Sequence, residues 1–585
     1  MRARRIRRSL CRHLVVVALL CVALGCTRGK ERSPAPSAPA TEAAPPAAAE
    51  AAPAAPPSAG GNWDEGILPA SMHEGTPKDG GEVVVHIRSE PPSLNTIVDS
   101  DWVASVITQP RIYESLLRVD PYDAPRFQIV PALAESWELS EDKKVYTLRL
   151  RHDVKWHDGQ PFTARDVIAT FDKIQDPTTK AAHLRSYTEE LQSHEAVDDY
   201  TVRLTWKRPY FLTLDALSFI SIQPAHIIGK MSGKEYNEAA TNPLNRAPMG
   251  TGPFRFEAWE SNQKIVLARN DAYWGKKAHL QRVVFRIVKD PTVALQLAER
   301  EELDTVDSVL PDQWVGMDSA KLRAAYHRSK FYDASYTWIG WNEERPFFKD
   351  KRVRRALTML TDRPGVAEKI MFGLPKPTTC HFYWQSRECD PALTPLPFDP
   401  PAAVKLLEEA GWVDRDGDGV REKDGRPFRF FFMLPAQSVT GERIATKMKE
   451  DFEHAGIDLA IQKVEWSSFT KRLRTHEFDA CTLSWVGDAR GDPTQIWHSN
   501  SIAGGSNYVG FRSAEADRIM EDARVEFDEE KRNAMYRRFG AILHQEQPYT
   551  FLFVPAKLSL VHRKLHGVRE TLQGWQFEDW WVETP

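Results

Sequence analysis

Alternating apolar and polar positions along the chain predict a series of short strands. In residues 145–150 the side chains of Tyr146, Leu148 and Leu150 share one face, which is the two-residue period of a half-buried strand. The same alternation, or a run of β-branched, apolar or aromatic residues, predicts further strands at 82–87, 202–206, 265–267, 283–288 and 478–485.

Helices alternate with these strands, and several begin at recognisable capping residues. Thr163 is a helix N-cap with Asp166 as its capping-box partner, and Asp350 and Asp399 cap two later helices. Residues 112–117 also have a helical pattern. Because strands and helices are mixed without a repeat over 585 residues, we predict a multi-domain α/β or α+β body.

The first residues have the features of an export signal. Several arginines precede an apolar segment at 14–24, which is too short to span a bilayer, and small residues lead directly to Cys26. We expect residues 1–25 to be a signal peptide and Cys26 to carry a lipid, the alternative being an ordinary signal peptide cut nearby. Residues 26–77 are then a lipid-anchored tether, because most of them are Ala, Pro, Ser, Glu and Gly and cannot form a core.

Charge and cysteine content narrow the possible partners. With 77 Lys and Arg against 81 Asp and Glu, the balance gives no reason to expect a nucleic-acid partner. In an oxidising compartment Cys380 and Cys389 can pair across their short loop, which leaves Cys481 as a buried thiol. We expect no cofactor and no metal, because no cysteine pair has metal-site spacing. The acidic run at 414–419 resembles the start of an EF-hand calcium loop. Such a loop needs a glutamate at its twelfth position, which here is Gly425, so we interpret the run as a turn.

The stretch 478–511 holds the most informative candidate site. A buried strand ends at Trp485, and the loop that follows contains Asp488 and Asp492 among glycines and a proline. A carboxylate beside a tryptophan at a strand end can hold a positive group of a ligand. Asp492 precedes Pro493 and is better explained as a turn or helix cap, whereas composition alone leaves both readings open for Asp488. Nucleophile-elbow, zinc-protease and P-loop motifs are absent from the sequence, so we expect a protein that is not an enzyme.

Several ordered motifs resemble the extracytoplasmic solute-binding proteins of family 5, the oligopeptide- and dipeptide-binding proteins of ABC importers. The most specific are Met249-Gly250-Thr251-Gly252-Pro253-Phe254 and Asn270-Asp271-Ala272-Tyr273-Trp274-Gly275, supported by blocks near 133–137, 156–159, 350–357 and 398–412. The similarity covers the chain from about Gly80 to its end.

The resemblance implies a two-lobed α/β fold of the periplasmic-binding-protein type, class II, with an extra subdomain on the first lobe. Lobe I comprises 78–120, 241–335 and 546–585, its subdomain comprises 121–240, and lobe II comprises 336–545. Two crossings, near Tyr336 and Tyr549, act as the hinge, and a ligand held by both lobes stabilises the closed form.

The resemblance also implies which residues contact the ligand. An aspartate in a Trp-x-x-Asp motif holds the α-ammonium group of a peptide, and Trp485 and Asp488 match that motif. The lobe I segment with Asp101 and Val103 pairs with the peptide backbone as an added strand. The other expected contacts are Trp466, Arg474, Thr482, Asp307 and Tyr187. Trp466 has core packing as an alternative, and Asp101 and Arg474 have the alternative of solvated surface residues.

The predicted function is that of a periplasmic, lipid-anchored receptor, a monomer, that delivers peptides to the permease subunits of an ABC importer in the inner membrane. The same fold also carries nickel chelates, sugars and opines, so another solute is the first alternative. An extracytoplasmic hydrolase with an unrecognised set of acids is the second alternative.

Overall fold

Seven strands from distant parts of the chain form the largest sheet of the structure, a computed structural model that describes residues 63, 65–123, 127–487 and 490–583. The strand order is β12-β20-β11-β1-β10-β9-β8. β1 runs parallel to β10, with Val83 opposite Val283, so the start of the body pairs with a strand about two hundred residues later. The bounds are β1 (Glu82–Ile87), β8 (Phe254–Glu260), β9 (Lys264–Arg269), β10 (Arg282–Ile287), β11 (Thr305–Val306), β12 (Tyr326–Phe331) and β20 (Lys557–His562).

A second sheet has five strands in the order β17-β16-β18-β13-β19, and a third has four in the order β4-β5-β7-β6. β18 lies at the centre of the second sheet, parallel to β16 and antiparallel to β13. The bounds of these strands are β13 (Ser335–Trp341), β16 (Arg429–Pro435), β17 (Asp458–Val464), β18 (Ala480–Val486), β19 (Tyr549–Phe553), β4 (Ala134–Leu139), β5 (Val145–Leu150), β6 (Leu191–Asp198) and β7 (Thr201–Trp206). Three two-stranded ribbons are β2 (Leu117–Val119) with β3 (Ile129–Pro131), β14 (Glu422–Lys423) with β15 (Arg426–Pro427), and β21 (Leu565–His566) with β22 (Trp581–Val582).

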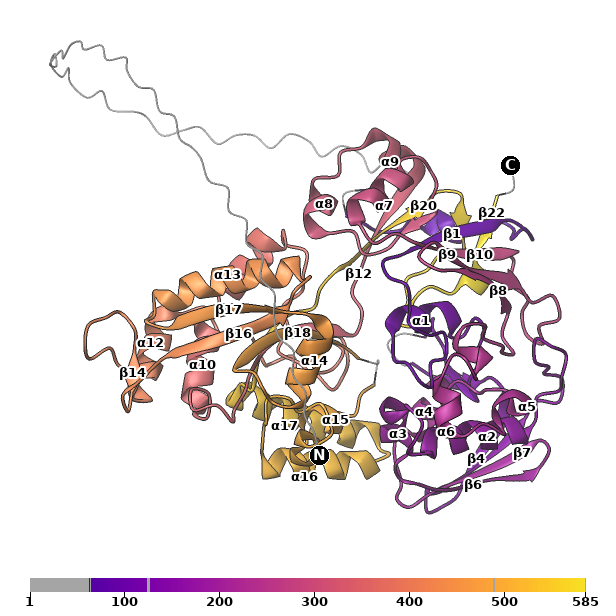
Figure 1. Cartoon of the computed structure of the whole chain (residues 1–585), viewed down its shortest axis with the longest axis horizontal. Helices are drawn as coiled ribbons and strands as arrows, with labels where there is room; N and C mark the ends of the chain where they lie inside the picture. Colours follow the sequence, from indigo (N-terminus) through magenta and orange to yellow (C-terminus); the bar gives the residue numbers. More distant parts are fainter. Residues whose placement is uncertain (1–62, 64, 124–126, 488–489, 584–585) are drawn as a thin grey trace, which may run out of the picture. The chain divides into compact units, whose positions relative to one another are not determined.

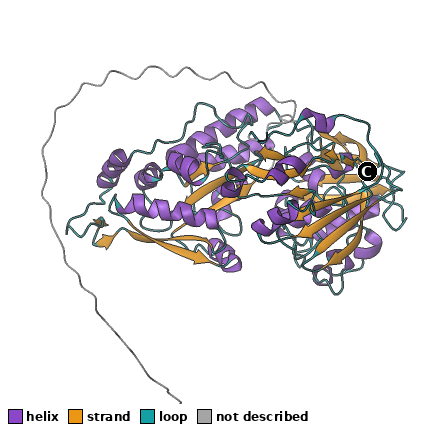
Figure 2. Cartoon of the chain, turned by 90° about the horizontal axis from the view of Figure 1, so that it is seen from above, coloured by secondary structure: helices purple, strands orange, loops and turns teal. Residues whose placement is uncertain are grey.

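Helices occur along the whole described part of the chain and are interleaved with the strands (Figures 1 and 2). α13 packs along β16 and β17 in the second sheet (Figure 1). The α-helices before the second sheet are α1 (Trp102–Thr108), α2 (Ala164–Gln175), α3 (Ala182–Thr188), α4 (Thr213–Phe219), α5 (Ala225–Ile228), α6 (Gly233–Asn237), α7 (Pro291–Ala298), α8 (Pro311–Val315) and α9 (Ala320–Ala325). Those after its first strand are α10 (Lys351–Leu360), α11 (Arg363–Gly365), α12 (Pro400–Glu409), α13 (Val439–Glu453), α14 (Trp466–Arg474), α15 (Thr494–Trp497), α16 (Ala514–Val525) and α17 (Glu529–Glu546). Short helical turns of other types are η1 (Ala70–His73), η2 (Pro243–Asn245), η3 (Val366–Ile370), η4 (Ser499–Ile502) and η5 (Phe577–Asp579).

The local sequence patterns predicted these elements well. The strand expected at 145–150 is β5, and its alternate residues Tyr146, Leu148 and Leu150 are buried. Asp350 and Asp399 accept hydrogen bonds from the first turns of α10 and α12, as their capping positions require. Thr163 and Asp166 form the expected capping box at the start of α2.

The helix expected at 112–117 is wrong, because this backbone packs against the glycine motif instead. The amide of Gly252 donates to the carbonyl of Ile112 at 3.0 Å, and Phe254 donates to Arg111 at 2.9 Å. A Cβ atom at Gly250 would lie 1.7 Å from the carbonyl oxygen of Ile112, so only glycine permits this approach. Long-range contact therefore overrides the local helical pattern.

Glu114 explains why the two most specific motifs occur together. Its buried carboxylate accepts hydrogen bonds from Thr251 at 2.8 Å, from Tyr273 at 2.7 Å and from the indole of Trp274 at 2.9 Å. Burial raises the pKa of Glu114, while these three donors stabilise its charged form. Both motifs thus meet on one side chain of the segment that follows α1.

Part of the predicted tether packs against the folded body. Trp63 and Met72 are buried, and the side chains of Arg323 and Arg328 lie over the ring of Trp63. All described residues belong to one compact unit spanning Ser58–Pro585. The signal peptide, Cys26 and the tether up to residue 62 lie outside the described residues, and the predicted lobe boundaries stay predictions.

Candidate ligand-binding site

A cavity of about 730 Å³ is lined by residues of the seven-stranded sheet, of the five-stranded sheet and of α1, α3 and α4. The seven-stranded sheet contributes Phe331 and Lys557, the five-stranded sheet contributes Tyr336 and Trp485, and α4 beside the four-stranded sheet contributes Asp215. This volume lies within the range of roughly 300–1,000 Å³ that is usual for small-molecule sites. Segments more than three hundred residues apart in the sequence therefore form one pocket.

Trp485 lines this cavity, and a set of stacked rings supports it, while its contact with a ligand stays a prediction. Trp485 stacks on Trp338 and on Tyr508 with centroid distances of 6.0 Å each, and Trp338 stacks on Tyr549 at 4.0 Å. Its indole N–H donates to the Tyr549 hydroxyl at 3.5 Å. Stacked rings in a packed core restrict one another, so the end of β18 is held firmly where it meets the cavity.

Tyr187 and Asp307 also line the cavity. The ring of Tyr187, on α3, packs edge-on against Phe219 with a centroid distance of 4.8 Å. Asp307 follows β11, and one of its carboxylate oxygens accepts a hydrogen bond from the Ser559 hydroxyl at 3.1 Å. Three of the predicted contact residues are therefore brought together on the walls of one pocket.

The added-strand pairing predicted for the segment with Asp101 and Val103 is wrong, because this segment is a helix and not an extended edge, and a ligand contact of either residue stays a prediction. Asp101 is the N-cap of α1 and accepts a hydrogen bond from the amide of Ala104 at 2.9 Å. Val103 and Val106 both pack against the core of the seven-stranded sheet, and Trp102 and Val106 line the cavity. Helical periodicity places positions 102 and 106, four apart, on the same face, so added-strand pairing is not available here.

Trp466, Arg474 and Thr482 do not line the cavity. Trp466 begins α14, is half exposed, and stacks on Phe469 at 5.8 Å. Arg474 is an exposed residue at the last position of the same helix. Thr482 is buried, and its hydroxyl donates to the carbonyl of Trp338 at 2.9 Å. Their sequence positions matched the expected pattern, but the direction of each side chain depends on packing that the sequence does not display.

Asp488 lies outside the described residues, whereas Gly487 and Arg490 on either side of it line the cavity. Asp492 has the structural role expected of it, since it accepts a hydrogen bond from the amide of Thr494 at 3.0 Å. It also accepts from the Tyr210 hydroxyl at 3.0 Å and pairs with Arg524 at 3.2 Å. These contacts join the loop after β18 to the segment before α4.

Arg490 makes a second connection between the same two walls. Its guanidinium lies 2.9 Å from the carboxylate of Asp215 on α4 and donates to the carbonyl of Phe127 at 3.1 Å. Burial raises the pKa of Asp215, and the charge of Arg490 opposes that rise. Sequence reasoning missed this pair, because nothing in the local pattern at 210–215 indicates a partner near position 490.

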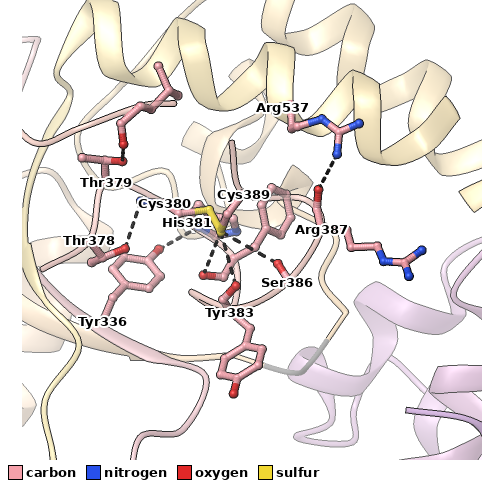
Figure 3. The surroundings of a disulfide bond; sticks show 12 residues. Tyr336, Thr378, Thr379, Cys380, His381, Tyr383, Ser386, Arg387, Cys389 and Arg537 are labelled. Atoms are coloured by element: carbon pink, nitrogen blue, oxygen red, sulfur yellow. Dashed lines mark hydrogen bonds between the residues drawn. A yellow bond between two sulfur atoms is a disulfide. The ribbon is translucent and has the colours of Figure 1, made fainter. Parts of the chain in front are cut away.

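The loop between Cys380 and Cys389 forms a further wall that was missed (Figure 3). These two cysteines form a disulfide, and Cys481 is a buried free thiol. His381, Phe382 and Tyr383 from this loop line the cavity. A run of four aromatic or imidazole side chains directly after a disulfide cysteine was the available sequence signal.

Carboxylates outnumber permanent cations among the described lining residues. The carboxylates are Glu114, Asp215, Asp307, Asp333, Asp492 and Glu570, and the cations are Arg111, Arg118, Arg490 and Lys557. Lys557 pairs with Asp333 at 2.7 Å, and burial raises the pKa of Glu570. The cavity therefore offers both carboxylates and aromatic rings to a ligand, and either can contact a positive group.

The acidic turn lies apart from this cavity. Ligand oxygens of Asp414, Asp416 and Glu422 lie within 4.8 Å of one another in the described chain. Both carboxylate oxygens of Asp414 accept hydrogen bonds from backbone amides, those of Gly417 at 2.8 Å and Gly419 at 3.1 Å. Such bonds within the turn account for the acidic residues as turn-forming groups.

A cavity lined by aromatic rings and charged groups from distant segments has the character of a binding site for a small solute. The chain belongs to the bacterial extracellular solute-binding proteins of family 5, because the model of that family's middle region matches residues 128–507. Members of this family are extracytoplasmic binding proteins of transport systems and not enzymes, and the two-lobed fold expected from the sequence is theirs.

Two relatives show how far the similarity extends. The chain is 30% identical to the oligopeptide-binding protein AppA of Bacillus subtilis over 526 residues, which is 88% of this chain and 94% of the relative. It is 29% identical to di/tripeptide-binding protein 2 of Pseudomonas aeruginosa over 484 residues, 78% of this chain and 86% of the relative.

Solved structures of two solute-binding proteins have the same fold as this chain. AppA of Bacillus subtilis in complex with a nonapeptide superposes with a TM-score of 0.76 at 28% identity, covering 87% of this chain and all of that one. NikA of Brucella suis in complex with Fe(III)-EDTA superposes with a TM-score of 0.76 at 25% identity, covering 86% of this chain and all of that one. None of the described helices has the length and apolar character needed to cross a membrane.

Proposed function

We propose that this chain is the lipid-anchored substrate-binding protein of an ABC importer, and that it captures short peptides for delivery to the permease. The observation that carries the proposal is the cavity that has Trp485 on its wall and is lined by further aromatic rings and by carboxylates. Relatives named as oligopeptide- and di/tripeptide-binding proteins support a peptide ligand. The volume of about 730 Å³ favours a peptide of a few residues, because it falls within the usual range for small-molecule ligands.

Asp488 is the residue that we assign to the α-ammonium group of the peptide, on the basis of its place three residues after Trp485. A charge-assisted hydrogen bond in an enclosed site contributes roughly 1.5–3 kcal/mol. The substitution Asp488→Asn keeps the size of the side chain and removes its charge. We expect it to weaken peptide binding more than tenfold, since about 1.4 kcal/mol corresponds to a factor of ten.

The experiment begins with native mass spectrometry of the protein purified without added ligand, which identifies any peptide that co-purifies. Calorimetric titration of that peptide then compares wild type, D488N and the control D199N. Asp199 is an exposed carboxylate paired with Arg165 at 3.7 Å, so its substitution removes the same charge far from the cavity. An unchanged affinity in D488N would rule out the amine-holding role.

A second candidate function is binding of another solute, such as a nickel chelate. The similarity to NikA, whose structure holds Fe(III)-EDTA, is the observation that favours it. Elemental analysis of the purified protein together with the same mass spectrometry separates the two functions. A peptide mass supports the first, a metal at a stoichiometric amount supports the second, and cleavage of a peptide pool would support a hydrolase.

The anchor is tested separately from the ligand. Growth of cells with labelled fatty acid should label the wild-type protein, and Cys26→Ser should abolish that label and release the protein from the membrane fraction. Persistent labelling of C26S would contradict lipid attachment at Cys26.

A further inference from the structure

His381 lies in a part of the cavity wall that several contacts hold in place (Figure 3). The disulfide between Cys380 and Cys389 closes the loop that contains it. On one side of His381 the hydroxyl of Thr379 donates to the carbonyl of Leu393 at 3.2 Å. On the other side Arg537 donates to the carbonyl of Arg387 at 2.8 Å. His381 is therefore carried by a fixed segment and not by a free loop.

Two hydrogen bonds determine which nitrogen of His381 carries the proton. The indole N–H of Trp497 lies 3.1 Å from Nδ1, and the hydroxyl of Tyr336 lies 2.7 Å from the same atom. An indole nitrogen can only donate, so Nδ1 must be an acceptor and cannot carry a proton. The neutral imidazole therefore carries its proton on Nε2.

The Nε2–H group has no acceptor among the residues that the structure describes. His381 keeps some accessible surface although burial lowers its pKa to about 3. The two observations agree, because a side chain deep in the fold can retain accessible surface where it borders a cavity, and His381 borders this one. The Nε2–H group is not among the buried donors left without a partner, so it reaches the cavity, where it can donate to water in the free protein and to a ligand oxygen in the complex.

We propose that His381 is a specificity-determining residue that donates a hydrogen bond from Nε2 to an oxygen of the bound peptide, either a backbone carbonyl or the terminal carboxylate. This proposal rests on the peptide-binding function proposed above. Tyr336 and Trp497 fix the tautomer through Nδ1 and so leave Nε2–H as a neutral donor over the physiological pH range. A neutral Nε2–H group can donate to either oxygen and adds no charge to the cavity.

Two substitutions of His381 separate the role of the Nε2–H donor from the structural role of the hydrogen bonds at Nδ1. In His381→Asn the amide oxygen can replace Nδ1 as acceptor for Trp497 and Tyr336, but nothing reaches the position of Nε2. In His381→Gln the longer amide places an N–H near the position of Nε2 and leaves Trp497 and Tyr336 without an acceptor. The first variant should lose affinity and keep thermal stability, and the second should lose thermal stability and keep affinity.

The probe is a pool of synthetic tripeptides, from which native mass spectrometry selects the best binder of the wild-type protein for calorimetry. We expect H381N to bind this tripeptide about three- to tenfold more weakly and H381Q to bind within about twofold of wild type. A C-terminally amidated form of the same tripeptide identifies the acceptor. If wild type and H381N bind the amide equally, the acceptor is the carboxylate, and if the difference persists, it is a carbonyl.

Equal affinity of H381N and wild type for the tripeptide would overturn the inference. Equal losses in both variants would overturn it too, because they would show a structural effect alone. If no tripeptide binds the wild-type protein, the peptide-binding function itself fails, which is a result distinct from either of these.

Discussion

The ion pair between Arg490 and Asp215 connects two walls of the cavity, the loop after β18 and helix α4. We predict that loss of this ion pair weakens the connection between them. Arg490 follows β18 and Asp215 lies on α4, and their charged groups are 2.9 Å apart with 27% and 19% of their side chains exposed. The substitution Asp215→Asn keeps the shape of the side chain and removes the charge. It leaves Arg490 with the carbonyl of Phe127 as its other partner, 3.1 Å away.

The magnitude follows from two opposing effects. Two unit charges about 4 Å apart attract by about 4 kcal/mol at an effective dielectric constant near 20. Desolvation opposes this attraction, and it exceeds the help from Arg490, because the pKa of Asp215 is raised in spite of that neighbour. In D215N the guanidinium of Arg490 loses its carboxylate partner and keeps the carbonyl of Phe127, and this partly buried charge without a counter-charge gives the expected net loss of about 1–2 kcal/mol between the two walls, a factor of roughly five to thirty in an equilibrium constant.

Calorimetry with the selected tripeptide measures this loss as a weaker affinity of D215N, and small-angle scattering measures it as a larger maximum dimension without ligand. The control is again D199N, whose carboxylate is 66% exposed beside an Arg165 that is 79% exposed, so its loss should cost no more than about 0.5 kcal/mol. If D215N matched D199N in both measurements, the idea that this ion pair couples the walls would be refuted.

The titration of His381 and the disulfide give two more predictions. The pKa of His381 is lowered from 6.5 to about 3, so the unfolded chain binds more protons than the folded chain between these values, and stability falls as the pH drops through that window. Chemical denaturation should show that wild type loses about 2 kcal/mol more than H381N between pH 7 and pH 5, and equal losses would contradict the buried neutral state. The disulfide links residues nine apart, so its loss in Cys389→Ser should cost about 2–3 kcal/mol of unfolding free energy. Dithiothreitol should lower the melting temperature of wild type and leave that of C389S unchanged.

Local features of this chain were predictable because their causes are local. A cap such as Asp350 needs only an acid before an amphipathic run, and the alternating residues of β5 need only one buried face. The segment at 112–117 failed for the opposite reason. Its helical pattern is genuine, but its carbonyls and Glu114 bind the glycine and tryptophan motifs more than one hundred residues later.

The residues of the candidate site show the same difference between features with local causes and features with long-range causes. Trp485 could be placed from the sequence because it ends a recognisable buried strand, and β18 lies at the centre of its sheet. Val103 could not, because successive helical residues differ by a rotation of about 100° around the axis, and this rotation decides whether position 102 or 103 faces the cavity. The roles of His381 and Asp215 were not predicted, because their partners are distant in the chain. Contacts between such distant residues depend on tertiary packing and not on local propensity.

Contacts within the protein that span the cavity contribute to ligand affinity but not to selectivity. Arg490 with Asp215, Asp492 with Tyr210, and the amide of Phe211 with the carbonyl of Arg524 at 3.0 Å all join the two walls without using any ligand atom. Such contacts favour the closed arrangement before a ligand binds, and by linkage they raise the apparent affinity for every ligand that fits. They cannot distinguish one ligand from another. Discrimination therefore depends on polar groups that face the cavity and lack a protein partner, because only these cost free energy when the ligand fails to match them.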